Sequence, residues 1–115
     1  MDIARHQNVS VIALDTAYEA LDQAKFDAAQ SMLLEHAETV EPALVVLDLS
    51  KTAYLGSAFI EVIFRAWKRV KAREGKLVLC GVQPLCAEVL RTTRLDSVVA
   101  CFADVEAAVR GVQIA

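Results

Sequence analysis

Residues 43–63 read ALVVLDLSKTAYLGSAFIEVI, and this stretch decides the fold. Its first part, residues 43–49, opens with an apolar run without alternation, which is typical of a strand covered on both faces. Its last part begins a strongly periodic segment, residues 57–74, that predicts a helix. Gly56 permits a tight entry, and Ser57 is expected at the N-cap, where its hydroxyl would accept a hydrogen bond from a free backbone N–H. We therefore expect a central strand, a loop and a helix that starts at Ser57.

Strand-like and helix-like segments alternate on both sides of this stretch. Strands are expected at residues 3–5, 9–14, 43–49, 77–80 and 98–102. Helices are expected from the Leu21-Asp22 pair to near Thr39, at 57–74, at 84–93, and from an Asp104 cap to about Arg110, with residues 15–20 as a loop. Alternation of this kind implies parallel crossovers. The sequence thus predicts an α/β fold: a mixed sheet with an antiparallel N-terminal hairpin, parallel central strands and about four helices.

Composition places the chain among compact globular proteins. Its 115 residues, 56% of them hydrophobic, suffice for one domain with a real core, so we expect a single domain over residues 1–115. The net charge of −3 gives no reason to expect nucleic acid or an anionic membrane as a partner. The apolar runs are too short to span a bilayer, and the N-terminus lacks a signal-peptide pattern. The expected location is the cytoplasm, without membrane insertion.

The cysteines and histidines give no pattern of chemistry. Cys80 and Cys101 lie in expected strands and are interpreted as small buried residues, and Cys86, at a helix start, as a packing residue. His6 and His36 are expected to be exposed, because no carboxylate or cysteine pattern near them predicts a metal site or a triad. The four glycines are isolated, so there is no phosphate-binding loop. We expect no enzyme activity, no metal and no cofactor.

Three segments carry a resemblance that covers nearly the whole chain: LDLS at residues 47–50, YLGSA at 54–58 and GKLVLCGV at 75–82. The chain resembles a STAS domain of the bacterial anti-sigma factor antagonist family. In that family a Phe-Leu-Asp-Ser-Ser-Gly-like loop follows the strand, and the partner kinase phosphorylates the serine after the Asp. That serine aligns with Ser57, whereas Gly56, Ala58 and Phe59 replace the family's Asp, second Ser or Thr, and Gly.

The resemblance implies an anti-sigma factor antagonist in a partner-switching system. Its protein partners would be a serine-kinase anti-sigma factor and a phosphatase, and phosphorylation of Ser57 would regulate the binding. The three replacements favour an alternative, an interaction module that docks on a transporter or signalling complex without phosphorylation. From the residues alone, a helix cap with no further role is the commoner meaning of a serine at the position of Ser57.

The two sides of the expected helix at residues 57–74 differ in composition: one is apolar and the other is charged. Phe59, Ile63, Ala66, Trp67 and Val70 share one side and should pack on the sheet. Phe64 projects on the other side with the charged residues, as a half-exposed partner contact or a ring covered by a neighbouring element. The basic residues of that side are interpreted as a solvated face. The expected partner-binding residues are Tyr54, Gly56, Ser57, Ala58, Glu61, Phe64 and Lys68. Asp48 is expected to support the loop through hydrogen bonds to its N–H groups, the alternative being a catalytic base.

Overall fold

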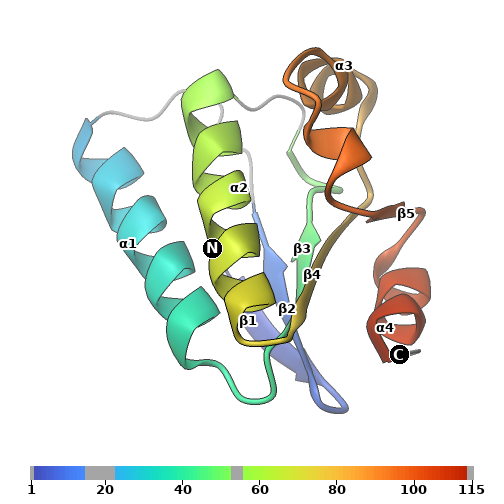
Figure 1. Cartoon of the computed structure of the whole chain (residues 1–115). Coiled ribbons are helices and arrows are strands. Elements are labelled where there is room, and N and C mark those ends of the chain that lie inside the picture. The colour runs from blue at the N-terminus through green and yellow to red at the C-terminus, as the bar shows by residue number, and fades with distance from the viewer. Residues whose placement is uncertain (1, 15–22, 53–55, 114–115) are drawn as a thin grey trace.

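The structure, a computed structural model, describes residues 2–14, 23–52 and 56–113 (Figure 1). The strands in these ranges are β1 (Asp2–His6), β2 (Val9–Ala13), β3 (Leu44–Asp48), β4 (Lys76–Cys80) and β5 (Cys101–Phe102). The helices are α1 (Gln23–Thr39), α2 (Ser57–Ala72), α3 (Pro84–Thr92), the 3-10 helix η2 (Leu95–Ser97) and α4 (Val105–Gln113). The loop predicted at residues 15–20 lies outside the described residues.

The strands form one sheet in the order β1-β2-β3-β4-β5. β1 pairs with β2 in antiparallel fashion, and the other three pairings are parallel. In β3, Val46 lies opposite Val11 of β2 and Val78 of β4, so β3 is an inner strand. The predicted mixed sheet with an N-terminal hairpin is confirmed, and so is the inner position of the strand predicted at residues 43–49.

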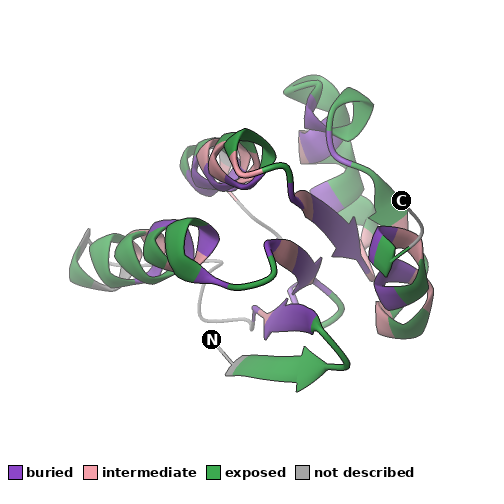
Figure 2. Cartoon of the chain, turned by 60° about the horizontal axis from the view of Figure 1, so that its bottom comes forward, coloured by how far each residue is buried: buried purple, intermediate pink, exposed green. Residues whose placement is uncertain are grey.

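Apolar residues fill both faces of the sheet, as Figure 2 shows by the buried colour of its central strands. α1 and α2 cover one face, and the larger core cluster beneath them contains Val45 and Leu47 of β3. α4 covers the other face, where Val46 packs in a second cluster with Ala108 and Val109. Successive side chains of a strand point to opposite faces. The run in β3 lacks alternation because helices cover both of its faces.

Contacts along their length join α2 to α1. Near its start, the Phe59 ring packs edge-on against the Phe26 ring of α1, with centroids 6.0 Å apart. Near its end, Arg69 Nη1 lies 2.7 Å from Glu38 Oε1, and Arg73 donates to the carbonyl oxygen of Ala37 at 3.1 Å. These contacts hold α2 against α1 and leave its other long side toward α3 and solvent.

Two helix starts were predicted from capping residues, with different outcomes. Asp104 caps α4, because its Oδ1 accepts a hydrogen bond of 2.8 Å from the Ala107 N–H. The predicted N-cap at Ser57 is wrong by one residue. Gly56 occupies the N-cap with extended backbone (φ −73°, ψ 159°), and its carbonyl oxygen already accepts the Phe59 and Ile60 N–H groups. Ser57 is therefore the first residue of α2.

The strand predicted at residues 98–102 is much shorter in the structure. Only Cys101 and Phe102 pair with β4, and η2 precedes them. The Val98 and Val99 N–H groups donate to the Leu95 carbonyl oxygen, a turn-like pattern that replaces pairing with β4. Cys101 is exposed on this edge strand, so its interpretation as a buried residue is wrong. An apolar run next to a turn is thus not a strand along its whole length.

Candidate functional site

Hydrogen bonds hold the first residues of the loop that follows β3. The Ser50 N–H donates to Asp48 Oδ1 at 3.0 Å, and the Gln83 side-chain amide donates to the Ser50 carbonyl oxygen at 2.7 Å. The Leu49 N–H donates to the Cys80 carbonyl oxygen at 2.9 Å, which continues the β3–β4 pairing by one residue. Asp48 thus makes a contact of the kind expected of a loop-supporting residue.

Thr52 is a buried polar residue of this loop that sequence analysis did not single out. It is fully buried, and its hydroxyl donates to the Leu14 carbonyl oxygen at 3.0 Å. Its own carbonyl oxygen lies 3.4 Å from the Cys86 Sγ, which donates to it. Cys86 is also fully buried, as expected of a packing residue. Thr52 thereby links the loop to the end of β2 and to α3.

Those predicted partner-binding residues that the structure describes lie at the start and on the outer side of α2. Gly56 is half-buried at the N-cap, and no side chain accepts a capping hydrogen bond from the first N–H groups of the helix. Ser57 is the first helical residue. Ala58 and Glu61 are exposed. Tyr54 lies outside the described residues. The helix start presents its first backbone N–H groups with no capping side chain, an arrangement that favours a negative charge nearby.

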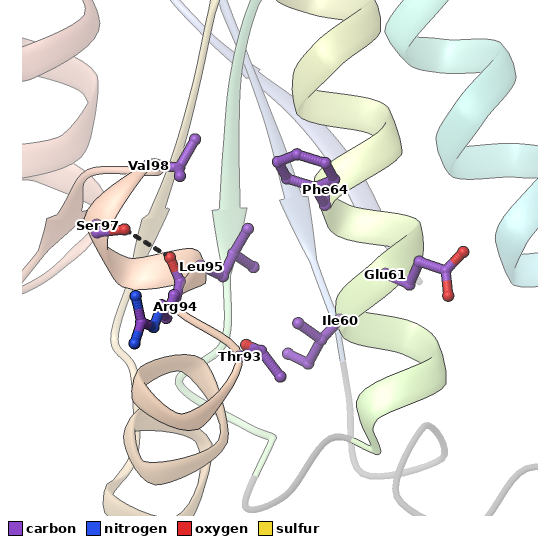
Figure 3. Close-up of a pocket in the computed structure, with 8 residues that line it drawn as sticks. All are labelled: Ile60, Glu61, Phe64, Thr93, Arg94, Leu95, Ser97 and Val98. Atoms are coloured by element: carbon purple, nitrogen blue, oxygen red, sulfur yellow. Dashed lines mark hydrogen bonds between the residues drawn. The ribbon is translucent and has the colours of Figure 1, made fainter.

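Further along α2, a groove of about 470 Å³ separates the helix from residues 93–98 (Figure 3). Ile60 and Phe64 line it on the α2 side, and Leu95 and Val98 line it on the other. Ile60 and Leu95 are buried and form the floor, whereas Val98 remains 42% exposed. The remaining lining residues are Glu61, Thr93, Arg94 and Ser97. In Figure 3 the carboxylate of Glu61 points away from the groove, so its interior is mainly apolar.

Phe64 is half-buried on the polar side of α2, where a half-exposed ring was one of the two predicted alternatives, and it packs against the edge of the core. Its ring stacks on the Trp67 ring at 5.7 Å between centroids and 19° between planes. Lys68 Nζ lies over the Phe64 ring at 5.6 Å, and Lys71 Nζ lies over the Trp67 ring at 5.9 Å. Trp67, predicted to pack on the sheet, is only partly buried. Phe64 and Lys68 thus belong to one surface with two residues that sequence reasoning did not assign to it.

Asp48 lines a different cavity from the one that the α2 residues line. It borders a separate cavity with Ser50, Gly81 and the start of α4. Burial, followed by the nearby Asp48 carboxylate, raises the pKa of the Cys80 thiol to about 12. That thiol is consequently protonated at neutral pH and lacks the thiolate that nucleophilic chemistry requires. The structure does not bring Asp48 and Phe64 to a common cavity.

The two histidines differ in environment. His6 is exposed, as predicted. The expectation for His36 is wrong, because it is half-buried and its Nε2 lies 2.6 Å from the hydroxyl oxygen of the buried Ser10. Within residues 2–14, 23–52 and 56–113, no group of three or more His, Cys, Asp or Glu residues is placed to hold a metal ion. Among the helices of these ranges, none has both the length and the apolar composition that a bilayer crossing requires.

Several solved structures of similar fold are named as anti-sigma factor antagonists. An anti-sigma-factor antagonist (STAS) domain protein from Planctomyces limnophilus superposes with a TM-score of 0.86 at 29% identity, over 97% of each chain. A putative anti-sigma factor antagonist from Thermotoga maritima has a TM-score of 0.84 at 17% identity, over 97% of this chain and 93% of that one.

A curated relative comes from a transporter. The putative sulfate transporter YvdB of Bacillus subtilis (strain 168) is 32% identical over 69 residues, which are 60% of this chain and 13% of the transporter. The chain therefore spans only a small part of that relative's length. The sequence model of the STAS domain matches residues 1–108, nearly all of the chain. Together with the mixed sheet and its four helices, this match shows that the chain belongs to the STAS domain family.

Proposed function

We propose that this chain is an anti-sigma factor antagonist of a bacterial partner-switching system. In its unphosphorylated form it binds a serine-kinase anti-sigma factor, phosphorylation of Ser57 releases that partner, and a phosphatase restores binding. The observation that carries the proposal is the place of Ser57, the first residue of α2 after the β3 loop, where the phosphorylated serine of the family aligns. The similarity to the Planctomyces limnophilus antagonist domain supports it. The role is that of a cytoplasmic binding protein without catalysis or cofactor.

A phosphate at this position would affect the fold and the partner differently. Phosphorylation adds about −1.5 to −2 charges and three acceptor oxygens. At the start of α2, which has no capping side chain, the free N–H groups and the helix dipole favour such a charge. A partner surface complementary to the neutral serine would meet an unmatched charge and a larger group. The modification would therefore weaken binding without unfolding the chain.

The direct test is incubation with ATP and a candidate serine-kinase anti-sigma factor from the same organism, followed by intact-mass measurement. The expected result is the addition of one phosphoryl group, which is lost in Ser57→Ala. Ser31→Ala is the matched control, because Ser31 is an exposed serine in α1. Phosphorylation that persists in Ser57→Ala, or none in the native chain, contradicts the switch.

A second candidate is a constitutive interaction module, as in a transporter complex. The local similarity to a putative sulfate transporter and the replacements around Ser57 favour it. Phe59, one of these replacements, is 2% exposed and packs on Phe26, so it changes the core rather than the surface. Only Gly56 and Ala58 alter what a partner or kinase would contact. Equal partner binding by phosphorylated and unphosphorylated protein would favour this second candidate.

A further inference from the structure

The surface beyond the start of α2 combines apolar rings with cations. Phe64 and Trp67 are half-buried and stacked, whereas Lys68 and Lys71 are exposed above them. We call these four residues the aromatic-lysine patch. Its Phe64 end opens into the groove bordered by Leu95 and Val98.

 That groove has the buried Leu95 as part of its floor. The patch and the groove share Phe64, so they form one apolar surface. Its rim carries Lys68, Lys71 and Arg94, with Glu61 as an acidic residue whose carboxylate points away from the groove (Figure 3).

The two lysines differ from Arg69 and Arg73 in their ion pairing among the described residues. Within the part of the chain that the structure describes, neither Lys68 nor Lys71 has a carboxylate within salt-bridge distance, in contrast to Arg69 and Arg73, which pair with Glu38 and Glu41. An exposed ammonium group over a half-buried ring stays available to an incoming anion. The patch therefore offers unpaired positive charge beside apolar area.

The spacing of the patch residues matches the side of a helix. Phe64, Trp67, Lys68 and Lys71 stand at i, i+3, i+4 and i+7, so they follow one stripe of α2. Ser57 precedes Phe64 by seven residues, which is about two helical turns, and so begins the same stripe. From Ser57 to Lys71 the stripe is about 21 Å long at 1.5 Å per residue. A straight helical segment of a partner would match its length and direction.

We propose that this surface binds an acidic amphipathic helix of the partner protein. Large apolar side chains of that helix would enter the groove beside Phe64 and Val98, and its flanking carboxylates would pair with Lys68 and Lys71. The inference rests on the proposed function, because it names the chemistry of the partner that binds beside Ser57. It also fixes the sign of the switch: phosphate at the start of the stripe repels an acidic helix, whereas it would attract a basic one.

The same observations disfavour two other occupants. Single-stranded nucleic acid needs open ring faces for base stacking, whereas each ring here contacts the other ring and carries a lysine over it. A second copy joined through the same patch in a two-fold contact would bring identical lysines together. An acidic helix meets both the apolar and the positive part of the surface.

The test uses the intrinsic fluorescence of the full unphosphorylated chain, because Trp67 is its single tryptophan and lies in the patch. The probes are two helical peptides of about 15 residues, enough to span the stripe, that share one apolar face and carry either Glu or Lys on its flanks. We expect the Glu peptide to shift the Trp67 emission and to bind about tenfold more tightly than the Lys peptide at low salt. Lys68→Glu should remove that preference. Arg110→Glu is the matched control, an equal change of charge on the exposed side of α4, and should retain the preference.

Several results would overturn the inference. They are equal binding of the two peptides, no binding of the Glu peptide, and a preference that survives Lys68→Glu. Tighter binding of an oligothymidylate, or a Trp67 shift that depends on protein concentration alone, would assign the surface to nucleic acid or to a second copy. Since no kinase is used, failure here leaves phosphorylation of Ser57 standing, and failure of phosphorylation leaves peptide binding standing.

Discussion

The hydroxyl oxygen of Ser10 lies 2.6 Å from His36 Nε2, and this hydrogen bond joins β2 to α1. Ser10 is fully buried, and His36 is half-buried. Burial, with a smaller contribution from the positive charge of Arg5, lowers the pKa of His36 from its ordinary value of 6.5. The folded state therefore favours the neutral imidazole, whose Nε2 shares this hydrogen bond with the Ser10 hydroxyl.

Stability should consequently fall on mild acidification. As the pH drops through 6.5, the unfolded chain binds a proton at His36 before the folded chain does, so the free energy of unfolding decreases until the lower folded-state pKa is passed. Above pH 6.5 the contribution is fully present. Urea titrations at a series of pH values should show this decrease, and His36→Gln should reduce it. Identical pH dependence in the native chain and His36→Gln would contradict the prediction.

The cap of α4 offers a second prediction. Asp104 Oδ1 accepts the Ala107 N–H, and α4 supplies most of the cover on its face of the sheet. Asp104→Ala should lower the free energy of unfolding by about 1 kcal/mol, whereas Asp104→Ser keeps an oxygen acceptor and should lose only a few tenths. Thermal unfolding followed by circular dichroism measures both changes. Equal losses in the two variants would show that the side-chain hydrogen bond does not stabilise the helix.

Most of the fold could be predicted because each element has a strong local signal. The residues of β3 and α2 that face the core are apolar, and the spacing of apolar residues along the chain therefore predicts both elements. The segment at 98–102 was wrongly predicted because its apolar residues serve different contacts: Val99 packs beside Leu95, whereas Val98 is exposed. Composition alone does not separate such a turn from a strand.

The site could be predicted only where it follows one helix. Helical geometry identified Phe64 and Lys68 as outer residues, and the N-cap was missed by one position because glycine and serine both suit it. The groove needs Leu95 and Val98, which stand more than thirty residues after Phe64 and reach it only through the tertiary fold. The buried contacts of Thr52 and His36 likewise join distant segments. The residues next to Thr52 and His36 in the sequence do not predict these contacts.

Phe64 and Phe59 make a matched pair for measuring burial. Phe59 is 2% exposed in the core, whereas Phe64 is half-buried beside the groove. Phe59→Ala should cost roughly 3 to 5 kcal/mol of folding stability, as expected for a buried ring. Phe64→Ala loses part of a ring and its stacking on Trp67, so we expect about 1 to 2 kcal/mol. Urea midpoints at unchanged slope compare the two, and an equal or larger loss in Phe64→Ala would show that Phe64 is a core residue.

Gly56 allows the missing cap to be added. It has extended N-cap backbone, no side-chain hydrogen bond, and nothing within 4 Å of where a Cβ would stand. Gly56→Asp should therefore raise the free energy of unfolding by about 0.5 to 1 kcal/mol, through a new cap and a less flexible unfolded chain. Gly75→Ala is the opposite case, because its Cβ would stand 2.5 Å from the Ala43 Cβ, and overpacking of this kind costs about 1 to 3 kcal/mol. Destabilisation by Gly56→Asp would mean that the backbone there does not act as an N-cap.

Ser57 separates fold stability from partner binding most directly. As the first residue of α2 rather than its N-cap, it can be replaced by Ala with a change of only a few tenths of a kcal/mol in the free energy of unfolding, and Ser57→Asp places a favourable negative charge at the helix start. Melting temperatures of all three forms should therefore agree closely. Affinity for the serine-kinase anti-sigma factor should fall by about tenfold or more in Ser57→Asp, because a carboxylate so placed opposes an acidic partner helix, and should be kept in Ser57→Ala. Equal affinity of all three forms would contradict the phosphorylation switch and favour a constitutive binding module, since a charge at the start of the stripe would then have no influence on partner binding.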